Sequence, residues 1–226
     1  DGCGVPEYKY EVTLIIYYAC QTCPTDGGTG GVTINYKSEQ AGLDTSLTLN
    51  PDKANAVTLH SLCPVYYPKN SCRDISKRDS FPAFQARAYV AQVTLPSAQP
   101  DWTFWYSSCC RNDANLVGGS GNSFYIEAGL NNQIKYNNST PRITSNPLPY
   151  LCVGQPTGYL TEPFDFNGDS LNVSQQYPMS GPAAYLTYKP GFSLADPIGS
   201  SAANPYILNP LTGTATFTPM SQGFMV

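Results

Sequence analysis

The chain has 226 residues, of which 41% are hydrophobic, and this is enough apolar material for one large or two ordinary domains. Charged residues make up only 12% and the net charge is −4, which argues against the clustered Lys and Arg that nucleic acids and anionic membranes require. The 17 tyrosines argue against a disordered tail, because such segments are poor in aromatic residues.

Alternating apolar residues predict strands throughout the first half of the chain. The first, KYEVTLIIYY, is apolar on both faces, since Leu14 and Ile16 share one face while Ile15 and Tyr17 share the other, and this predicts a central strand. The apolar run VTLIIYYAC is too short to span a bilayer, so we expect no membrane insertion. Further strands are expected at VTINY, TSLTL, NAVTLHSL and ARAYVAQVTLP, with NPDKA (50–54) as a turn before the third of these.

Both tryptophans lie in one predicted strand, DWTFWYSS (101–108), which precedes CCRN. Trp102 and Phe104 would share one face and are assigned to the core, whereas Trp105 is a candidate surface contact, as are Tyr66 and Tyr67. Arg111 could recognise a carboxylate, although such an arginine more often pins a loop through backbone carbonyls. A further strand, SFYIEAGL, follows a glycine-rich loop.

After residue 140 the chain becomes rich in Asn, Ser and Pro, as expected of an extended linker or edge segment. Short strands are then expected at SLNVS, AYLTY and TATFTP. The chain stops at SQGFMV within an apparent strand, so we expect it to be cut from a longer protein. The pattern predicts an all-β protein of two immunoglobulin-like or cadherin-like β-sandwich modules, residues 1–140 and a smaller module at 141–226.

An even number of cysteines in a charge-poor chain predicts disulfide bonds and an oxidising compartment. We expect all eight to be oxidised and to brace the modules: Cys3, Cys20, Cys23, Cys63, Cys72, Cys109, Cys110 and Cys152. A zinc site is disfavoured because the CxxC at Cys20–Cys23 has no second pair. We expect Cys63 to be bonded to Cys72, which would close a local loop. The adjacent Cys109 and Cys110 are expected to bond separate partners, since a bond between them would close a strained ring.

Several motifs together resemble a known module: DWTFWYSSCCRN (101–112), YIEAGLNN (125–132), NSTPRITSNPLPYLCVGQP (138–156), DFNGDSL (165–171) and GTATFTPMSQGFMV (213–226). The module recurs in large secreted surface proteins of Bacteroidota, the gliding-motility-associated adhesins exported by the type IX system. The opening strand also resembles the family's, although Ala19 replaces the usual acidic residue before Cys20. The resemblance implies extracellular placement at the cell surface and a role in adhesion or filaments, with neighbouring modules or copies as partners. It identifies no ligand.

Asp165, Asn167 and Asp169 place three oxygen-bearing side chains at alternate positions in one short loop. Hard cations such as Ca²⁺ prefer carboxylate and amide oxygens. The segment is not an EF-hand, because Ser170 and Gln176 occupy the positions of the invariant Gly and Glu. It is similar to the DxDGDxL loop of cadherin-like repeats, with Asn in place of the middle Asp. We therefore predict weak Ca²⁺ binding; the alternative is a plain Asx turn between strands.

Residues suited to catalysis are scarce, which predicts that the chain is not an enzyme. His60, the one histidine, lies in a predicted strand, where an ordinary histidine is expected. Asp44 begins a DTS triplet of the aspartic-protease type, but no second triplet occurs. Glu127 and Glu162 are candidates for the two carboxylates of a glycosidase, which are defined by their separation in space rather than in sequence. A carbohydrate-binding module that contacts surface glycans is the main alternative to an adhesive module, and a β-sandwich hydrolase is the weaker one.

Overall fold

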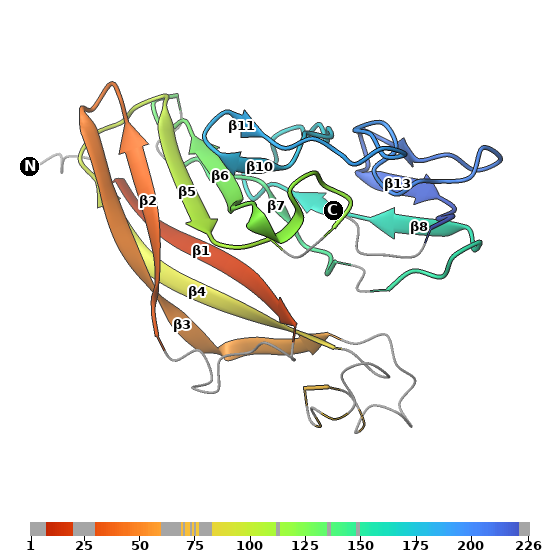
Figure 1. The fold of residues 1–226 in the computed structure, drawn as a ribbon. Helices are drawn as coiled ribbons and strands as arrows, with labels where there is room; N and C mark the ends of the chain where they lie inside the picture. Colours follow the sequence, from red (N-terminus) through yellow and green to blue (C-terminus); the bar gives the residue numbers. More distant parts are fainter. Residues whose placement is uncertain are drawn as a thin grey trace, which may run out of the picture. The chain divides into compact units, whose positions relative to one another are not determined.

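The computed structural model describes residues 8–19, 30–59, 83–111, 114–134, 137–147 and 150–221, together with residues 69, 71, 72, 74 and 76. The described chain is all-β, as predicted: its long elements are strands, and the 3-10 helix η3 (Gly119–Gly121) is a single turn (Figure 1). No helix in these ranges has the length and hydrophobicity that a membrane crossing requires.

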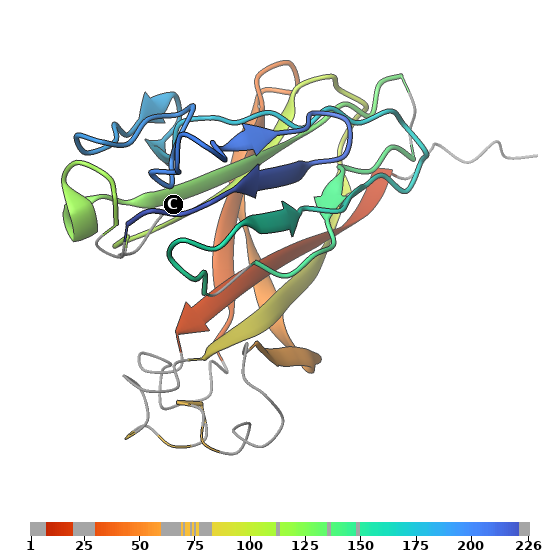
Figure 2. The ribbon, with the colours of Figure 1, turned by 90° about the vertical axis from the view of Figure 1, so that its right-hand side faces the viewer.

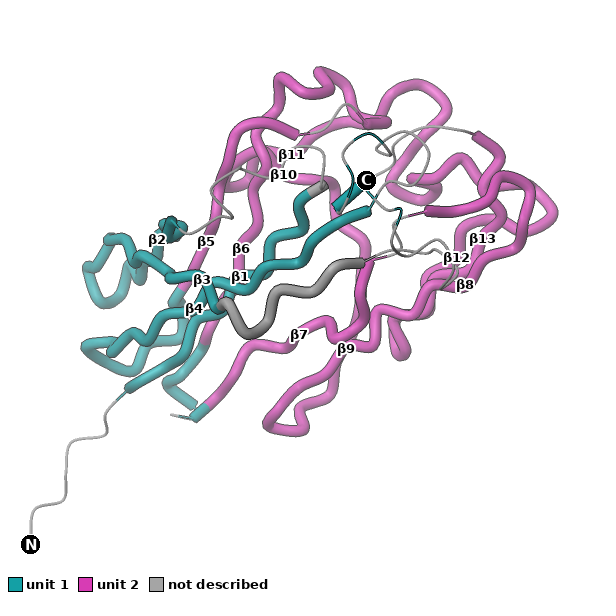
Figure 3. The backbone as a smooth tube through the Cα atoms, turned by 90° about the horizontal axis from the view of Figure 1, so that it is seen from below, with its two compact units in different colours: residues 1–102, 131–137 teal, residues 103–130, 138–226 magenta. Residues whose placement is uncertain are grey.

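The chain forms two compact units, each made of separate stretches of sequence (Figure 3). Unit 1 comprises residues 1–102 and 131–137, and unit 2 comprises residues 103–130 and 138–226. These units do not coincide with the predicted modules 1–140 and 141–226, because residues 103–130 belong to unit 2. The reason is strand pairing, since Tyr125 in this stretch is paired with Met179 much later in the chain.

Unit 1 contains an antiparallel sheet in the order β1-β4-β3-β2. β1 spans Tyr8–Ala19, β4 spans Phe84–Leu95, β3 spans Leu43–Leu59 and β2 spans Val32–Ser38. β1 and β4 are paired along their whole length and run side by side in Figure 2, in red and yellow. The predicted strands at VTINY and ARAYVAQVTLP are therefore confirmed.

The core of unit 1 is formed by alternate residues of these strands. Its buried apolar side chains include Leu14, Ile34, Leu49, Tyr89, Val93, Leu95 and Trp102. Trp102 has no exposed surface; its indole Nε1 donates a hydrogen bond to the Ser97 carbonyl at 3.3 Å, and its ring centroid lies 6.2 Å from that of Tyr36. The assignment of Trp102 to the core is confirmed.

Two local predictions for unit 1 are wrong. β1 is the first strand in the sheet order rather than a central one, and Ile15 and Tyr17 on its second face are exposed. β3 continues through residues 50–54, where a turn was predicted. There β3 changes partner, from β2 before Asn50 to β4 from Asn50 onward, with a register irregularity between Asp52 and Val57. The turn-forming residues thus produce an irregularity in a strand, a position that tolerates proline.

Asp101 fixes the turn between β2 and β3. Its carboxylate accepts a hydrogen bond from the buried Ser38 hydroxyl at 2.6 Å and from the backbone N–H groups of Glu39 and Gln40 at 2.9 and 3.1 Å. These bonds, the one from Ser38 first, hold the pKa of Asp101 below its ordinary value of 3.8. The ionised carboxylate therefore stabilises the turn.

Unit 2 contains short strands. Four of them follow one another in the sheet order: β5 (Trp102–Ser108), β6 (Phe124–Leu130), β10 (Met179–Gly181) and β11 (Ala184–Tyr185). The first residue of β5, Trp102, is the last residue of the first stretch of unit 1. β12 (Ile207–Leu208), β13 (Thr214–Phe217) and β8 (Thr157–Leu160) form a three-stranded sheet. β7 (Arg142–Ile143) pairs with β9 (Pro163–Phe164).

The strand predictions for unit 2 are met in part. The strands at DWTFWYSS, SFYIEAGL and TATFTP are confirmed as β5, β6 and β13. The predicted strand at AYLTY is reduced to two residues of β11, and SLNVS is not a strand. In that segment the Val173 N–H donates a hydrogen bond to the Pro210 carbonyl at 2.8 Å. Pro210 has no N–H group of its own, so it cannot donate a second bond of a strand pair.

Candidate binding site

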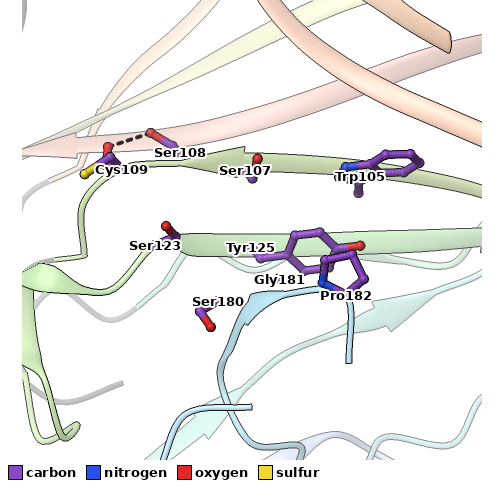
Figure 4. A pocket seen from close by; sticks show the side chains of 9 residues that line it. All are labelled: Trp105, Ser107, Ser108, Cys109, Ser123, Tyr125, Ser180, Gly181 and Pro182. Atoms are coloured by element: carbon purple, nitrogen blue, oxygen red, sulfur yellow. Dashed lines mark hydrogen bonds between the residues drawn. The ribbon is translucent and has the colours of Figure 1, made fainter. Parts of the chain in front are cut away.

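A pocket of about 300 Å³ opens on unit 2 over β5, β6 and β10. It is lined by Trp105, Ser107, Ser108, Cys109, Ser123, Tyr125, Ser180, Gly181 and Pro182. Figure 4 shows Trp105 and Ser107 along β5, Ser123 and Tyr125 along the neighbouring strand, and the Ser180–Pro182 segment where β10 ends. Alternate residues of a strand share a face, so the two strands present their side chains to the same side of the sheet.

The lining combines two aromatic rings with several hydroxyl groups. Trp105 is half-buried, whereas Tyr125 is only 4% exposed and its hydroxyl donates to Glu127 Oε2 at 2.7 Å. Burial first, and then the hydrogen bond and charge of Glu127, raise the pKa of Tyr125. The phenol therefore stays protonated and keeps its bond to the carboxylate, which fixes the ring in the pocket wall.

Arg111 holds together the strands that form the pocket. This buried residue donates from Nε to the Ser123 carbonyl at 3.1 Å and from Nη2 to the Met179 carbonyl at 2.8 Å. Its guanidinium also lies 4.8 Å from the ring centroid of Phe124. Desolvation lowers the pKa of Arg111. Of the two readings of this arginine, backbone pinning is the one that the structure confirms.

The cysteines only partly follow the prediction. Cys109 and Cys110 are bonded to each other, so the expectation of separate partners is wrong: the two sulfurs are directed at one another. Cys152 is exposed and not disulfide-bonded, which corrects the prediction for this residue; the bond between Cys109 and Cys110 leaves neither available to it. Cys72 is disulfide-bonded. The remaining cysteines lie outside the described residues: Cys3, Cys20, Cys23 and Cys63.

The loop at 165–169 is closed by its own side chains. Asp165 Oδ1 accepts the backbone N–H groups of Asn167 and Asp169 at 2.7 and 3.2 Å, and Asn167 Oδ1 accepts the N–H of Ser139 at 2.7 Å. This is the hydrogen bonding of an Asx turn. Among the described residues, no cluster of three or more His, Cys, Asp or Glu is placed to hold a metal. Weak Ca²⁺ binding by Asp165, Asn167 and Asp169 stays a prediction.

The other candidates that the structure describes, Asp44, Glu127 and Glu162, lie on different elements or connections. His60, Tyr66 and Tyr67 lie outside the described residues. Asp44 lies exposed in β3, opposite Lys37. Glu127 lies in β6 and bonds Tyr125, whereas Glu162 lies between β8 and β9 with φ at 49° and offers its backbone carbonyl to Thr144.

Sequence reasoning identified Trp105 as a possible contact but missed the rest of the pocket. Ser180, Gly181 and Pro182 come from a hairpin in which Gly181 is paired with Ala184, and Ala183 adopts a positive φ of 53°. The Gly-Pro pair marks a turn. Nothing in the local pattern, however, indicates that this turn lies beside β6, because that contact depends on strand pairing across 54 residues, between Tyr125 and Met179.

Comparison of the chain with family models, with curated proteins and with solved structures finds no match.

Proposed function

We propose that the chain is a non-enzymatic structural and adhesive module of a bacterial surface filament or gliding adhesin, of the type that Bacteroidota export by the type IX system. It acts outside the cell, next to further modules or copies of the same protein. Both parts of the chain belong, in this proposal, to the immunoglobulin-like or cadherin-like class of disulfide-braced β-sandwich modules.

The observation that carries this proposal is that three of the four cysteines in the described part of the chain are disulfide-bonded, namely Cys109 with Cys110, and Cys72, while Cys152 is free. Disulfides persist in extracellular and periplasmic compartments and are rare in the reducing cytosol. An acidic, charge-poor, tyrosine-rich composition and the motif resemblance support the same placement.

Antibody labelling of intact cells tests the location. We expect an antibody raised against the folded chain to label unpermeabilised cells of the source organism as strongly as permeabilised ones. Labelling that requires permeabilisation would contradict surface placement. Peptide mapping of the natural protein under non-reducing conditions is the matched chemical test, and it should recover Cys109 and Cys110 in one oxidised peptide with Cys152 as a thiol. Fully reduced cysteines would contradict the extracellular assignment.

A carbohydrate-binding role is the second candidate, and one observation favours it. The pocket beside Trp105 offers an aromatic ring and hydroxyl groups on one face of the sheet. This role is compatible with adhesion, because an adhesive module needs a ligand on the opposing surface.

A further inference from the structure

We propose that the pocket over β5, β6 and β10 binds a single uncharged sugar residue at the end of a glycan. This inference rests on the proposed adhesive function, because it names the class of ligand that the module would adhere to. The residues that line the pocket all belong to unit 2.

The lining has the two kinds of group that sugar recognition requires. A pyranose has an apolar face of C–H groups and a rim of hydroxyls. The Trp105 ring offers a flat aromatic surface for the first. For the second, Ser107 and Ser123 offer hydroxyls that can donate one hydrogen bond and accept others, whereas the Ser180 hydroxyl already donates to the Ala184 carbonyl at 3.4 Å and offers its oxygen as an acceptor. Figure 4 shows the aromatic and serine side chains distributed over adjacent strands, so that one ligand can contact both kinds.

The charged side chains of Glu127 and Arg111 near the pocket already bond protein atoms. Each of the lining residues is uncharged. The neighbouring Glu127 carboxylate accepts the Tyr125 hydroxyl at 2.7 Å, and the Arg111 guanidinium donates to the Ser123 and Met179 carbonyls. A carboxylate or ammonium group on the ligand would therefore find no oppositely charged side chain in the lining, whereas the hydroxyls of a neutral sugar find hydrogen-bond partners there. This favours neutral sugars over uronic acids and amino sugars.

The strand arrangement disfavours an extended peptide as the ligand. Peptides commonly bind by adding a strand to a free sheet edge, where backbone donors and acceptors are available. β6 is flanked in the sheet by β5 on one side and β10 on the other. At the pocket itself β6 is paired with β10 through Tyr125 and Met179, so recognition there depends on the side chains that project from the sheet.

The size of the pocket limits the ligand and its affinity. Ligand pockets range from about 300 to 1,000 Å³, so a pocket of about 300 Å³ accommodates one sugar residue rather than an oligosaccharide. A ligand of this size in an open site binds with a Kd on the order of millimolar. Such weak binding becomes effective when many copies of a surface protein engage many glycan ends at once.

The test is a titration of the whole folded chain with neutral methyl glycosides of glucose, galactose and mannose and with N-acetylglucosamine. Glucuronic acid and glucosamine serve as charged comparators. Tryptophan fluorescence is an informative readout, because the chain has two tryptophans and Trp102 is fully buried in unit 1, so that a change on binding reports on Trp105. Calorimetry measures the variants that lack the fluorophore.

Three variants make the test specific. Trp105→Ala should weaken binding about tenfold or more through loss of stacking. Ser107→Arg changes an exposed residue and places a long side chain across the opening, so it should abolish binding while the fold persists. The matched control is Tyr185→Ala, which removes an aromatic ring that is 53% exposed but does not line the pocket, and it should stay within about twofold of the unmutated chain.

Saturable binding of at least one neutral glycoside that both pocket variants remove and the control keeps would support the inference. Absence of binding across the neutral panel, a preference for the charged comparators, or binding that survives both pocket variants would overturn it. Failure here would leave the adhesive proposal intact if intact cells are labelled by antibody. Loss of that labelling with sugar binding retained would instead remove the proposed function and keep the pocket as a glycan site.

Discussion

Replacement of Arg111 should destabilise the chain far more than replacement of a comparable arginine at the surface. Arg111→Leu removes two hydrogen bonds to backbone carbonyls and a contact with the Phe124 ring. Hydrogen bonds from a charged donor contribute about 1.5–3 kcal/mol each, and the two carbonyls left behind are poorly placed to regain partners. We expect a loss of about 3–5 kcal/mol in the free energy of unfolding, which is the contribution of the two bonds less the desolvation cost of the guanidinium.

The matched control is Arg142→Leu. Its guanidinium lies 4.1 Å from the ring centroid of Phe166, so Arg142 makes the same type of cation–π contact as Arg111. Unlike Arg111, it is exposed. Its loss should cost about 0.5–1 kcal/mol. Urea unfolding followed by circular dichroism compares the two: with a slope of about 2 kcal/mol per molar, the midpoint should fall by roughly 1.5–2.5 M for Arg111→Leu and by well under 1 M for Arg142→Leu. Equal shifts would refute the role assigned to Arg111.

Three further predictions concern the core, the acid response and calcium. Trp102→Ala should lower the free energy of unfolding by about 3–5 kcal/mol in the same urea assay, and a loss below about 1 kcal/mol would contradict its core position. Asp101→Asn should flatten the dependence of stability on pH in acid. Because the pKa of Asp101 in the folded chain is below 3.8, its stabilisation is present above pH 3.8 and is lost as the pH falls through the folded pKa. Identical profiles for the variant and the unmutated chain would contradict the turn assignment. Ca²⁺ at millimolar concentration should raise the melting temperature relative to a chelator; Asp165→Ala and Asp169→Ala should remove that rise and Asn172→Ala should keep it, and coincident curves for the unmutated chain would leave the Asx turn alone.

The parts of the fold that depend on local alternation could be predicted from the sequence. β1, β4 and β5 have long alternating stretches, and each forms where the pattern indicates. Trp102 could be assigned to the core for the same reason, whereas the sequence left two roles open for Arg111 and favoured the pinning of a loop. At these positions the residue type and the alternation of apolar residues were sufficient to predict the strand and the burial of the side chain.

The parts that depend on pairing between distant segments could not be predicted. The segment 50–54 contains turn-forming residues, yet β3 continues because a second strand, β4, is present to take over its pairing. The pocket likewise exists only because β10 pairs with β6. The Cys109–Cys110 bond was missed because adjacent cysteines were expected to avoid the ring that a bond between them closes.

The central claim, that this is an adhesive surface module, is tested most directly by retention of cells on a glycan-coated surface under flow. Deletion of the gene from the source organism should reduce the number of retained cells, and reintroduction of the unmutated gene should restore it. Reintroduction of the Trp105→Ala or Ser107→Arg form should not, whereas the Tyr185→Ala form should. Equal retention of the deletion strain and its parent, on this surface and on uncoated glass alike, would contradict the claim.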